Sequence, residues 1–290
     1  MPSDISILTL GNARYPSLIK QLTNPPRQLY IRGNVDTLQE KYLLAVVGSR
    51  SANEYGRRVC EKILPPLVQT GIVLVSGLAH GIDSYAHKVC VDFKRPTIAV
   101  LGSGVDDDSI YPKSNLKLVE KILTTGGCLI SEHPVGQKSL RHFFPQRNRI
   151  IAGLTKATLL IQAKEKSGSL ITARLALEAN REVLAIPGPI TDPLSWGTNM
   201  LIKDGATPIT SAEDVLNLYG LEKNEASPTV NPQLSLEHSL ILKHLSADPM
   251  HIDTLIQTIA VPSEKIIAQL LELELLGIVQ QLGGMRYIRK

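Results

Sequence analysis

The chain has 290 residues, of which 43% are hydrophobic and 20% charged, so it can form one large domain, or a large and a small one, around a real core. Its formal net charge of +4 permits an anionic partner without requiring one. Cys60, Cys90 and Cys128 form no CxxC pair, which argues against a zinc site or a disulfide framework and fits a reducing cytoplasm. Because the sequence shows neither a signal peptide nor a run of about 18 apolar residues, we expect a cytoplasmic protein without a membrane segment.

Residues 1–41 contain turn signals such as Asn24-Pro25-Pro26, and we expect them to form a lead-in, a helix and then a short strand, that packs on the core. Short apolar runs then alternate with helical patterns through residue 220. The runs are Leu43–Val47, Ile72–Val75, Thr97–Leu101, Cys128–Ile130, Ala157–Ile161 and Val183–Ile186. Apolar strands separated by helices predict a doubly wound α/β domain over residues 42–220, with a mostly parallel sheet that is buried on both faces.

Small and polar residues follow several of these strands at the point where each strand ends. Gly48-Ser49-Arg50 follows the first, residues 76–83 the second, residues 102–104 the third and residues 131–133 the fourth. Parallel strands place their carboxyl ends on one edge of the sheet, where doubly wound sheets bind ligands. Glycine amides and Arg50 at the start of a helix suit a phosphate, although a plain strand-to-helix turn explains them equally well.

The segment from residue 133 to residue 164 contains no Asp or Glu. It holds six cations, namely Lys138, Arg141, Arg147, Arg149, Lys156 and Lys164, and two adjacent rings, Phe143 and Phe144. Cations follow phosphates, and exposed rings stack on bases that no complementary strand covers. The segment therefore predicts a single-stranded nucleic acid site on a strand-end loop. The alternative is a solvated basic loop with both phenylalanines buried in the core.

Two roles are open for Arg147 and Arg149. If they contact phosphates, changing either to Ala weakens oligothymidylate binding and flattens its salt dependence, while the melting temperature stays nearly unchanged. If one of them anchors the loop to a carboxylate such as Glu132, the same change unfolds the protein instead.

Other conspicuous residues have simpler explanations. No third ligand accompanies His80 and His87, so we expect no metal site, and we expect His87 to be a packed helix residue. Asp106-Asp107-Asp108 is expected to be a solvated acidic turn that leads to Tyr111. Pro65-Pro66 is expected to end or kink the helix that follows Arg50. Residues 167–169 open a helix and can cap it, hold a phosphate, or do both.

The chain changes character after residue 220. Residues 221–233 are polar and contain two prolines, which is typical of a linker. Residues 234–290 predict three helices and a hairpin, the pattern of a small winged-helix domain. Its third helix carries Glu264, Glu272 and Glu274 against Lys265 alone, and acids outnumber strong bases six to five over the domain. We therefore expect this domain to contact protein, or to contact duplex DNA only weakly.

The motifs GSR, SGLAHGID, LGSGVD, LISEHPVG, FPQRNRIIAGL and SGSLITA occur in an order that closely resembles the DprA/Smf family, over about residues 15–216. The resemblance implies an extended Rossmann domain that binds single-stranded DNA, forms a homodimer, protects incoming DNA and loads the RecA recombinase in natural transformation. It implies a binding protein without a cofactor rather than an enzyme, and a C-terminal winged helix. The DNA-binding residues it implies, together with the pattern above, are Gly48, Ser49, Arg50, Lys138, Arg141, Phe144, Arg147, Asn148, Arg149, Gly168 and Ser169.

A different class of function is nucleotide hydrolysis, because the same superfold hosts enzymes similar to the cytokinin-activating phosphoribohydrolases. Those enzymes need a glycine-rich phosphate loop and a positioned glutamate. Glu178 is the nearest candidate in this chain, but no PGGxGT motif precedes it. Steady hydrolysis of a nucleoside monophosphate would favour the enzyme.

Overall fold

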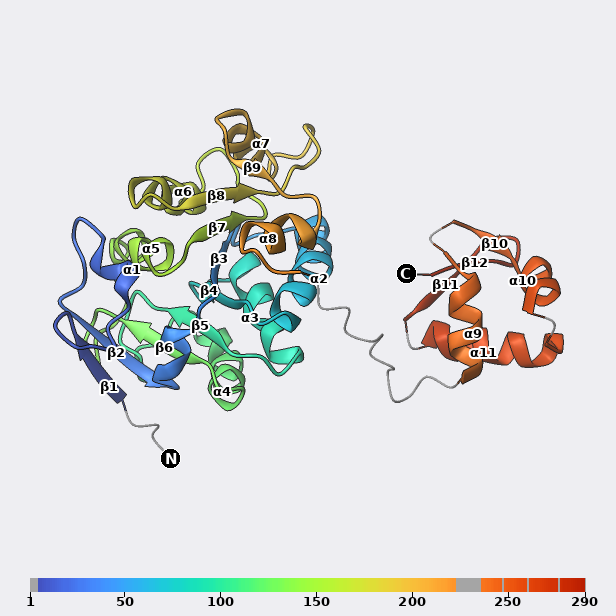
Figure 1. The fold of residues 1–290 in the computed structure, drawn as a ribbon, viewed down its shortest axis with the longest axis horizontal. Helices are drawn as coiled ribbons and strands as arrows, with labels where there is room; N and C mark the ends of the chain where they lie inside the picture. Colours follow the sequence, from blue (N-terminus) through green and yellow to red (C-terminus); the bar gives the residue numbers. More distant parts are fainter. Residues whose placement is uncertain (1–4, 223–235, 247, 260, 276, 290) are drawn as a thin grey trace. The chain divides into compact units, whose positions relative to one another are not determined.

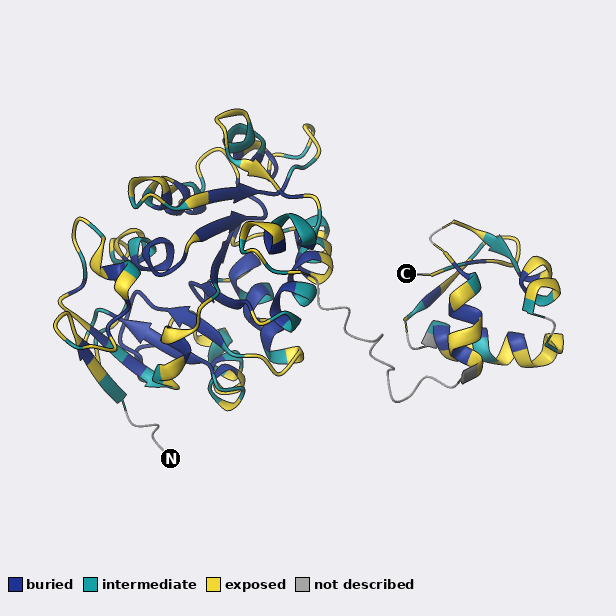
Figure 2. Ribbon diagram, viewed as in Figure 1, coloured by how far each residue is buried: buried dark blue, intermediate teal, exposed yellow. Residues whose placement is uncertain are grey.

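The computed structural model describes residues 5–222, 236–246, 248–259, 261–275 and 277–289. The chain divides into two compact units, Met1–Asn224 and Glu225–Lys290 (Figure 1). Each unit has its own buried apolar core (Figure 2). Most of the expected linker, from residue 223 to residue 233, lies outside the described residues.

The described strands of the larger unit form a nine-stranded sheet with the order β1-β2-β6-β5-β4-β3-β7-β8-β9. Its parallel strands are β3 (Leu43–Val47), β4 (Val73–Ser76), β5 (Thr97–Val100), β6 (Cys128–Ser131), β7 (Ala157–Leu160), β8 (Glu182–Ala185) and β9 (Thr207–Pro208). Strands β3 to β7 are buried along their whole length, which explains their continuous apolar sequences. The predicted mostly parallel α/β sheet is confirmed.

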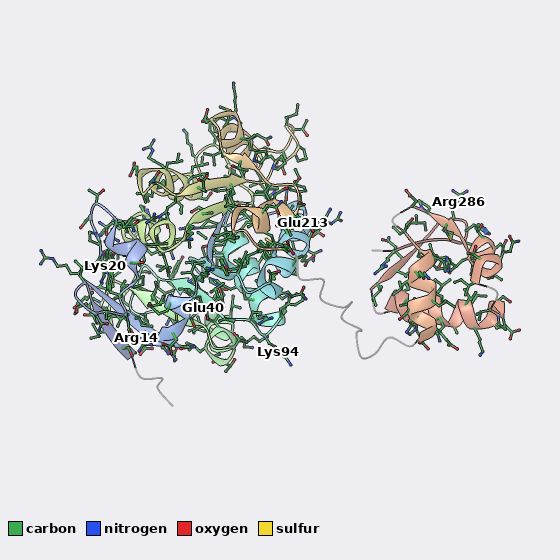
Figure 3. The ribbon with its side chains drawn as sticks, viewed as in Figure 1. Arg14, Lys20, Glu40, Lys94, Glu213 and Arg286 are labelled. Atoms are coloured by element: carbon green, nitrogen blue, oxygen red, sulfur yellow. The ribbon has the colours of Figure 1, made fainter. Side chains whose placement is uncertain are left out.

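Helices cover both faces of this sheet. On one face lie α2 (Glu54–Gln69), α3 (Ile82–Asp92), α4 (Leu116–Thr124) and α8 (Ala212–Leu218), and on the other α1 (Ser17–Lys20), α5 (Phe143–Leu154) and α6 (Gly168–Glu178); α7 (Trp196–Lys203) packs near β8. Two short 3₁₀ helices, η1 (Val35–Gln39) and η2 (Lys113–Asn115), complete the unit. Charged side chains such as Arg14, Lys20 and Lys94 lie at its periphery (Figure 3). Since the chain builds from β3 toward β6 on one side and from β7 toward β9 on the other, β3 and β7 are neighbours at a topological switch point.

The lead-in contains the expected helix and strand, α1 and β2, together with a further strand that precedes them. Strand β1 (Ile5–Thr9) pairs antiparallel with β2 (Gln28–Gly33), and β2 pairs antiparallel with β6. We did not predict β1, because Leu8 is its only buried residue and the run therefore lacks a regular apolar pattern. The Tyr15 hydroxyl donates to the Pro26 carbonyl oxygen at 2.6 Å, and the buried Ile19 fixes the connecting segment on the core.

Two local features differ from what we expected. Pro65-Pro66 does not end helix α2, which continues to Gln69, because Leu64, Leu67 and Val68 are buried on either side of the proline pair and hold the last turn in place. The basic segment is also not a strand-end loop, since residues 143–154 form helix α5. Pro145 lies in the first turn of α5, where a backbone N–H has no partner within the helix, so proline is tolerated there.

The smaller unit has the predicted winged-helix composition. Its helices are α9 (Leu236–His244), α10 (Ile252–Ile259) and α11 (Ser263–Leu275), and its antiparallel strands are β10 (Met250–His251), β11 (Val279–Leu282) and β12 (Arg286–Arg289). Leu255, Leu270 and Tyr287 belong to its core. Gly284, with a φ of +74°, lies in the turn between β11 and β12, where the backbone conformation favours glycine.

Candidate nucleic-acid interface

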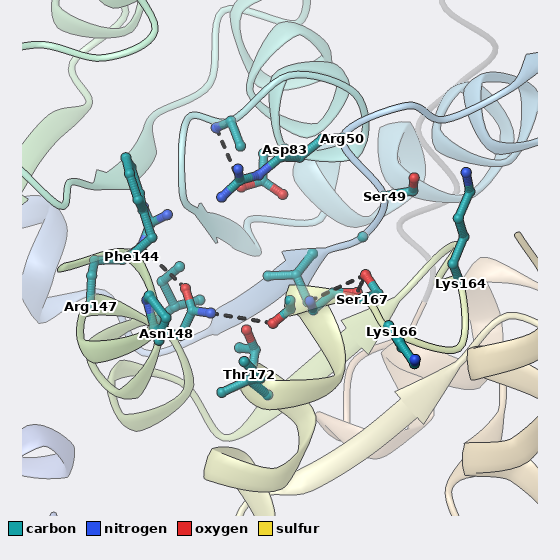
Figure 4. Close-up of a pocket in the computed structure, with 18 residues that line it drawn as sticks. Ser49, Arg50, Asp83, Phe144, Arg147, Asn148, Lys164, Lys166, Ser167 and Thr172 are labelled. Carbon is teal, nitrogen blue, oxygen red and sulfur yellow. Dashed lines mark hydrogen bonds between the residues drawn. The ribbon is translucent and has the colours of Figure 1, made fainter. Parts of the chain in front are cut away.

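A cavity of about 350 Å³ opens where β3 and β7 end (Figure 4). Its walls are the loops after β3, β4 and β7, the start of α3, and the first turns of α5 and α6. Neighbouring strands at a switch point send their chains to opposite faces of the sheet, which leaves a crevice between the two loops. The lining residues are Val47, Gly48, Ser49, Arg50, Ala79, Asp83, Phe144, Pro145, Arg147, Asn148, Ile151, Lys164, Lys166, Ser167, Gly168, Ser169, Ile171 and Thr172.

The turn after β3 is rigid because α3 packs closely against it. A Cβ at Gly48 would lie 2.6 Å from Cγ1 of Ile82, and a Cβ at Gly81 would collide with the Ser49 carbonyl oxygen. The Ile82 amide donates to that carbonyl at 3.2 Å. The sequence therefore needs glycine at both positions to bring the turn and the start of α3 together.

Gln162 is a positioning residue that we did not find in the sequence. It is fully buried just after β7, where its carbonyl oxygen accepts from the Ser49 amide at 2.8 Å. Its side-chain amide donates to Asn53 Oδ1 at 2.7 Å, and the same Asn53 oxygen accepts from the Gly56 amide at the start of α2. Gln162 thus ties the loops after β3 and β7 together, but in the sequence it is only a polar residue after an apolar run.

A ring and a guanidinium group meet at the mouth of the cavity. Arg50 is exposed, and its guanidinium carbon lies 5.4 Å from the centre of the Phe144 ring. The neighbouring Phe143 stacks on His133 at 3.9 Å between ring centres. Both phenylalanines are half-buried, so neither is enclosed in the core as the alternative interpretation of the basic segment required.

Arg147 lines the same cavity but is only 3% exposed. Its guanidinium group donates to the Gly77 carbonyl oxygen at 2.7 Å and to the Val100 carbonyl oxygen. Nearby, the buried Asp83 carboxylate accepts from the Gly77 and Ala79 amides at 3.1 and 3.4 Å. Burial lowers the pKa of Arg147 to about 10 and raises that of Asp83, while each group opposes the other's shift. These bonds hold the loop after β4, so the structure favours the anchoring role for Arg147.

Arg149 lies outside the cavity and also has the anchoring role. Its guanidinium group donates two hydrogen bonds to the Glu132 carboxylate, at 3.0 and 2.7 Å. Glu132 is the carboxylate that we named from the sequence as the partner of an anchoring arginine. Lys138 also lies outside the cavity, where its Nζ donates to the Asp108 carbonyl oxygen, and the exposed Arg141 does not line the cavity either. The other predicted site residues do meet there: Gly48, Ser49, Arg50, Phe144, Arg147, Asn148, Gly168 and Ser169.

The loop after β7 contributes two lysines that were not among the predicted site residues. Lys164 and Lys166 are exposed and lie beside Ser167 and the start of α6 (Figure 4). Ser167 Oγ accepts from the Ser169 amide at 3.4 Å, so the expected capping role is present, and the positive end of the helix dipole faces the cavity. Only the strand order, which the sequence does not reveal, places these lysines opposite Arg50.

Residues considered for other chemistry lie elsewhere. Glu178 is the exposed last residue of α6, about 15 Å along the helix axis from Gly168, and does not line the cavity. His87 is a packed helix residue, as expected, with Nδ1 2.9 Å from Thr97 Oγ1. Among the described residues, no three His, Cys, Asp or Glu side chains come together as a metal would require. No helix in the described part of the chain has both the length and the apolarity to span a membrane.

Comparison with known proteins decides the family. The sequence model of DNA recombination-mediator protein A matches residues 6–220, and that of the DprA winged helix domain matches residues 225–285. This chain belongs to the DprA/Smf family. It is 38% identical to protein Smf of Escherichia coli K12 over 284 residues, which cover 95% of this chain and 75% of that protein. It is 43% identical to DNA processing protein DprA of Streptococcus pneumoniae R6 over 202 residues, which cover 70% of each.

Solved structures of the family agree with this fold. The X-ray structure of DprA from Streptococcus pneumoniae matches with a TM-score of 0.69 and 40% identity, over 74% of this chain and 75% of that chain. A structure of DNA processing protein A from Helicobacter pylori, which concerns its single-stranded DNA binding mode, matches with a TM-score of 0.67 and 28% identity, over 77% of this chain and all of the other.

Proposed function

We propose that this DprA/Smf family member binds single-stranded DNA in the cavity between β3 and β7. The observation that carries the proposal is the contact between the Phe144 ring and the Arg50 guanidinium group at the mouth of a cavity that Lys164 and Lys166 also line. A half-buried ring offers a face for a base, and the cations suit the phosphates on either side of it. The single-stranded DNA binding of the related protein from Helicobacter pylori supports the proposal.

The shape of the site favours an unpaired strand over a duplex. A cavity of about 350 Å³ is comparable to a small-molecule site and has room for a base and its sugar-phosphate, but not for stacked base pairs. Glycine amides, a guanidinium group and one ring read no base edge in particular, so we expect little sequence preference.

We extend the proposal to the role that family membership implies. In that role the protein acts in the cytoplasm as a homodimer, protects incoming DNA and loads the RecA recombinase during natural transformation. Sedimentation equilibrium tests the dimer, nuclease digestion of a bound strand tests protection, and the rate of RecA filament formation on single strands with and without this protein tests loading. A monomer, or a filament rate that this protein does not raise, contradicts the corresponding part.

The binding test compares labelled oligothymidylate with duplex DNA across a salt series. Phe144→Ala should cost about 1–3 kcal/mol of binding free energy, and Arg50→Ala should reduce the salt slope by about 0.7. Lys121→Ala, which removes an exposed cation on α4, is the matched control and should change neither quantity. Equal affinity for duplex, or no loss in either of the first two variants, would contradict the proposal.

Nucleotide hydrolysis remains the alternative to test beside it. Glu178 does not line the cavity, and among the described residues that do line it Asp83 is the acidic one. Hydrolysis of a nucleoside monophosphate that the Arg50→Ala variant loses would replace the binding proposal with an enzymatic one.

A further inference from the structure

The acidic turn at Asp106-Asp107-Asp108 precedes Tyr111, whose ring contacts the Phe144 ring of the cavity, and its first two carboxylates are engaged within the fold. Asp106 accepts from the Gly136 amide and from the Ser109 hydroxyl, both at 2.8 Å. Asp107 forms an ion pair with Arg32 at 2.5 Å. The turn is therefore held in a defined shape, and Arg32 neutralises the charge of Asp107.

Two lysine ammonium groups converge on this turn from separate segments. Lys113 Nζ donates to the Asp107 and Asp108 carbonyl oxygens at 2.6 and 3.1 Å, and Lys138 Nζ donates to the same Asp108 oxygen at 2.5 Å. Both lysines are exposed. An ammonium group has three hydrogens to donate, so both lysines keep capacity for an outside acceptor. With Arg32, the two ammonium groups balance the three carboxylates of the turn, so the lysines attract a phosphate through their remaining hydrogens and their exposed charges rather than through a net positive charge.

Tyr111 projects from the same turn between two anchored neighbours. Ile110 and Pro112 are buried, whereas Tyr111 is 53% exposed. Its ring centre lies 5.8 Å from that of Phe144, with an angle of 53° between the planes. Tyr111 is thus a large exposed ring on a fixed backbone beside Phe144, and it offers a second face on which a base can stack.

We propose that Tyr111, Lys113 and Lys138 form a second nucleotide subsite, in which Tyr111 stacks on a base and the lysines bind a phosphate. This inference rests on the proposed single-stranded DNA function. One strand carries a charge about every 3.4 Å, so the separation of the two rings corresponds to about one or two nucleotides. The strand that enters the cavity at Phe144 therefore continues along the carboxyl edge of the sheet over β5, and Lys138 contacts DNA from outside the cavity.

A fluorescent reporter tests the stacking directly. The chain has a single tryptophan, Trp196, so Tyr111→Trp in a Trp196→Phe background places the only indole at the subsite. Titration of this full-length protein with oligothymidylates of about 4 to about 16 nucleotides should quench its fluorescence. Phe93→Trp in the same background is the matched control: Phe93 is 41% exposed, but it lies between α3 and β5, near the amino ends of the strands, so its signal should not change.

Affinities across the length series provide the second readout. Tyr111→Ala should weaken binding of the longer oligonucleotides at least about fivefold and leave the shortest ones unaffected, while Tyr111→Phe should bind like the unaltered protein. Lys138→Ala should reduce the salt slope for long strands by about 0.7. If strands bind and Phe144→Ala weakens them, but Tyr111→Trp is not quenched and Tyr111→Ala loses no affinity, the subsite is wrong and the proposed function stands. If no strand binds at all, both fail.

Discussion

The guanidinium group of Arg147 occupies the space that a side chain at Gly77 would need. It donates to the Gly77 carbonyl oxygen at 2.7 Å, and a Cβ at Gly77 would lie 2.6 Å from both of its terminal nitrogens. The Gly77 amide is bound in turn to the Asp83 carboxylate. Helix α5 is thereby fixed to the loop after β4, which sets where Phe144, one turn earlier, meets the cavity.

Replacing Arg147 should therefore cost stability as well as binding. Arg147→Ala leaves the Gly77 and Val100 carbonyl oxygens without their donor and removes the nearby positive charge that favours the ionised form of the buried Asp83, so we expect the free energy of unfolding to fall by about 3–5 kcal/mol. Arg147→Lys should not restore the lost stability, because one ammonium group cannot replace the planar guanidinium group with its several N–H donors. Urea unfolding measures both, and Lys88→Ala, an exposed cation on α3, should leave the midpoint unchanged. An unchanged midpoint for Arg147→Ala would return this residue to the phosphate-contacting role.

Arg149 and Glu132 should stabilise the fold as a pair and contribute little to DNA binding. Their side chains are 17% and 20% exposed, and the contact is bidentate. A double-mutant cycle with Arg149→Ala and Glu132→Ala should give a coupling free energy of about 1–3 kcal/mol. Oligothymidylate affinity of Arg149→Ala should stay much closer to that of the unaltered protein than the affinity of Arg50→Ala does. A loss as large as that of Arg50→Ala would show that Arg149 leaves Glu132 to contact DNA.

The sequence predicted the site residues that directly follow a strand or open a helix. Continuous apolar runs such as residues 43–47 locate the buried strands, and the residues after each run then lie on one edge of the sheet. That reasoning brought Arg50, Phe144 and Gly168 together correctly, because each lies in the first residues after a strand or at the start of a helix.

The remainder depends on strand order and burial, which local patterns do not contain. Lys166 follows Glu165 and so falls outside the acid-free segment, yet the adjacency of β3 and β7 places it in the cavity. Arg147 and Arg149 look equivalent in the sequence, but they lie on different sides of α5, one in the core against Gly77 and one against Glu132. An arginine that anchors a helix and one that binds phosphate have the same sequence signature.

His87 should make stability fall in mild acid. Burial lowers its pKa from 6.5 to about 3, with a smaller contribution from Arg147. The Thr97 hydroxyl donates to the Leu74 carbonyl oxygen at 2.7 Å, so His87 Nδ1 must be the donor to Thr97, and a second proton would have to enter an apolar interior. The unfolded chain takes up that proton below about pH 6.5 and the folded chain does not, so this contribution to stability is lost progressively as the pH falls from about 6.5 toward 3.

Urea unfolding at pH 7.5 and pH 5.5 measures this effect. His87→Gln cannot titrate, so between these two pH values it should lose about 1.4 kcal/mol less than the unaltered protein. The difference between the two proteins isolates His87 from the carboxylates. An identical loss in both would mean that His87 takes up its proton in the folded state.

The C-terminal unit should contribute little to DNA binding of either kind. In a winged helix that reads DNA, the third helix enters the major groove and its exposed face carries groups for phosphates and base edges. On α11 that face carries Glu264 and Glu272 with Lys265 as the cation among them, together with Ile267 and Leu271, which are 48% and 58% exposed. Carboxylates repel phosphates, and exposed aliphatic side chains suit a protein surface better than a groove of DNA.

A chain that ends at Asn224, the boundary of the larger unit, should therefore bind oligothymidylate as the full chain does, within about twofold. The weak affinity of the full chain for duplex DNA should change equally little. Duplex binding that is tight in the full chain and disappears with residues 225–290 would assign that binding to the winged helix, in which case Arg286 and Arg289 on β12 would be the first residues to replace.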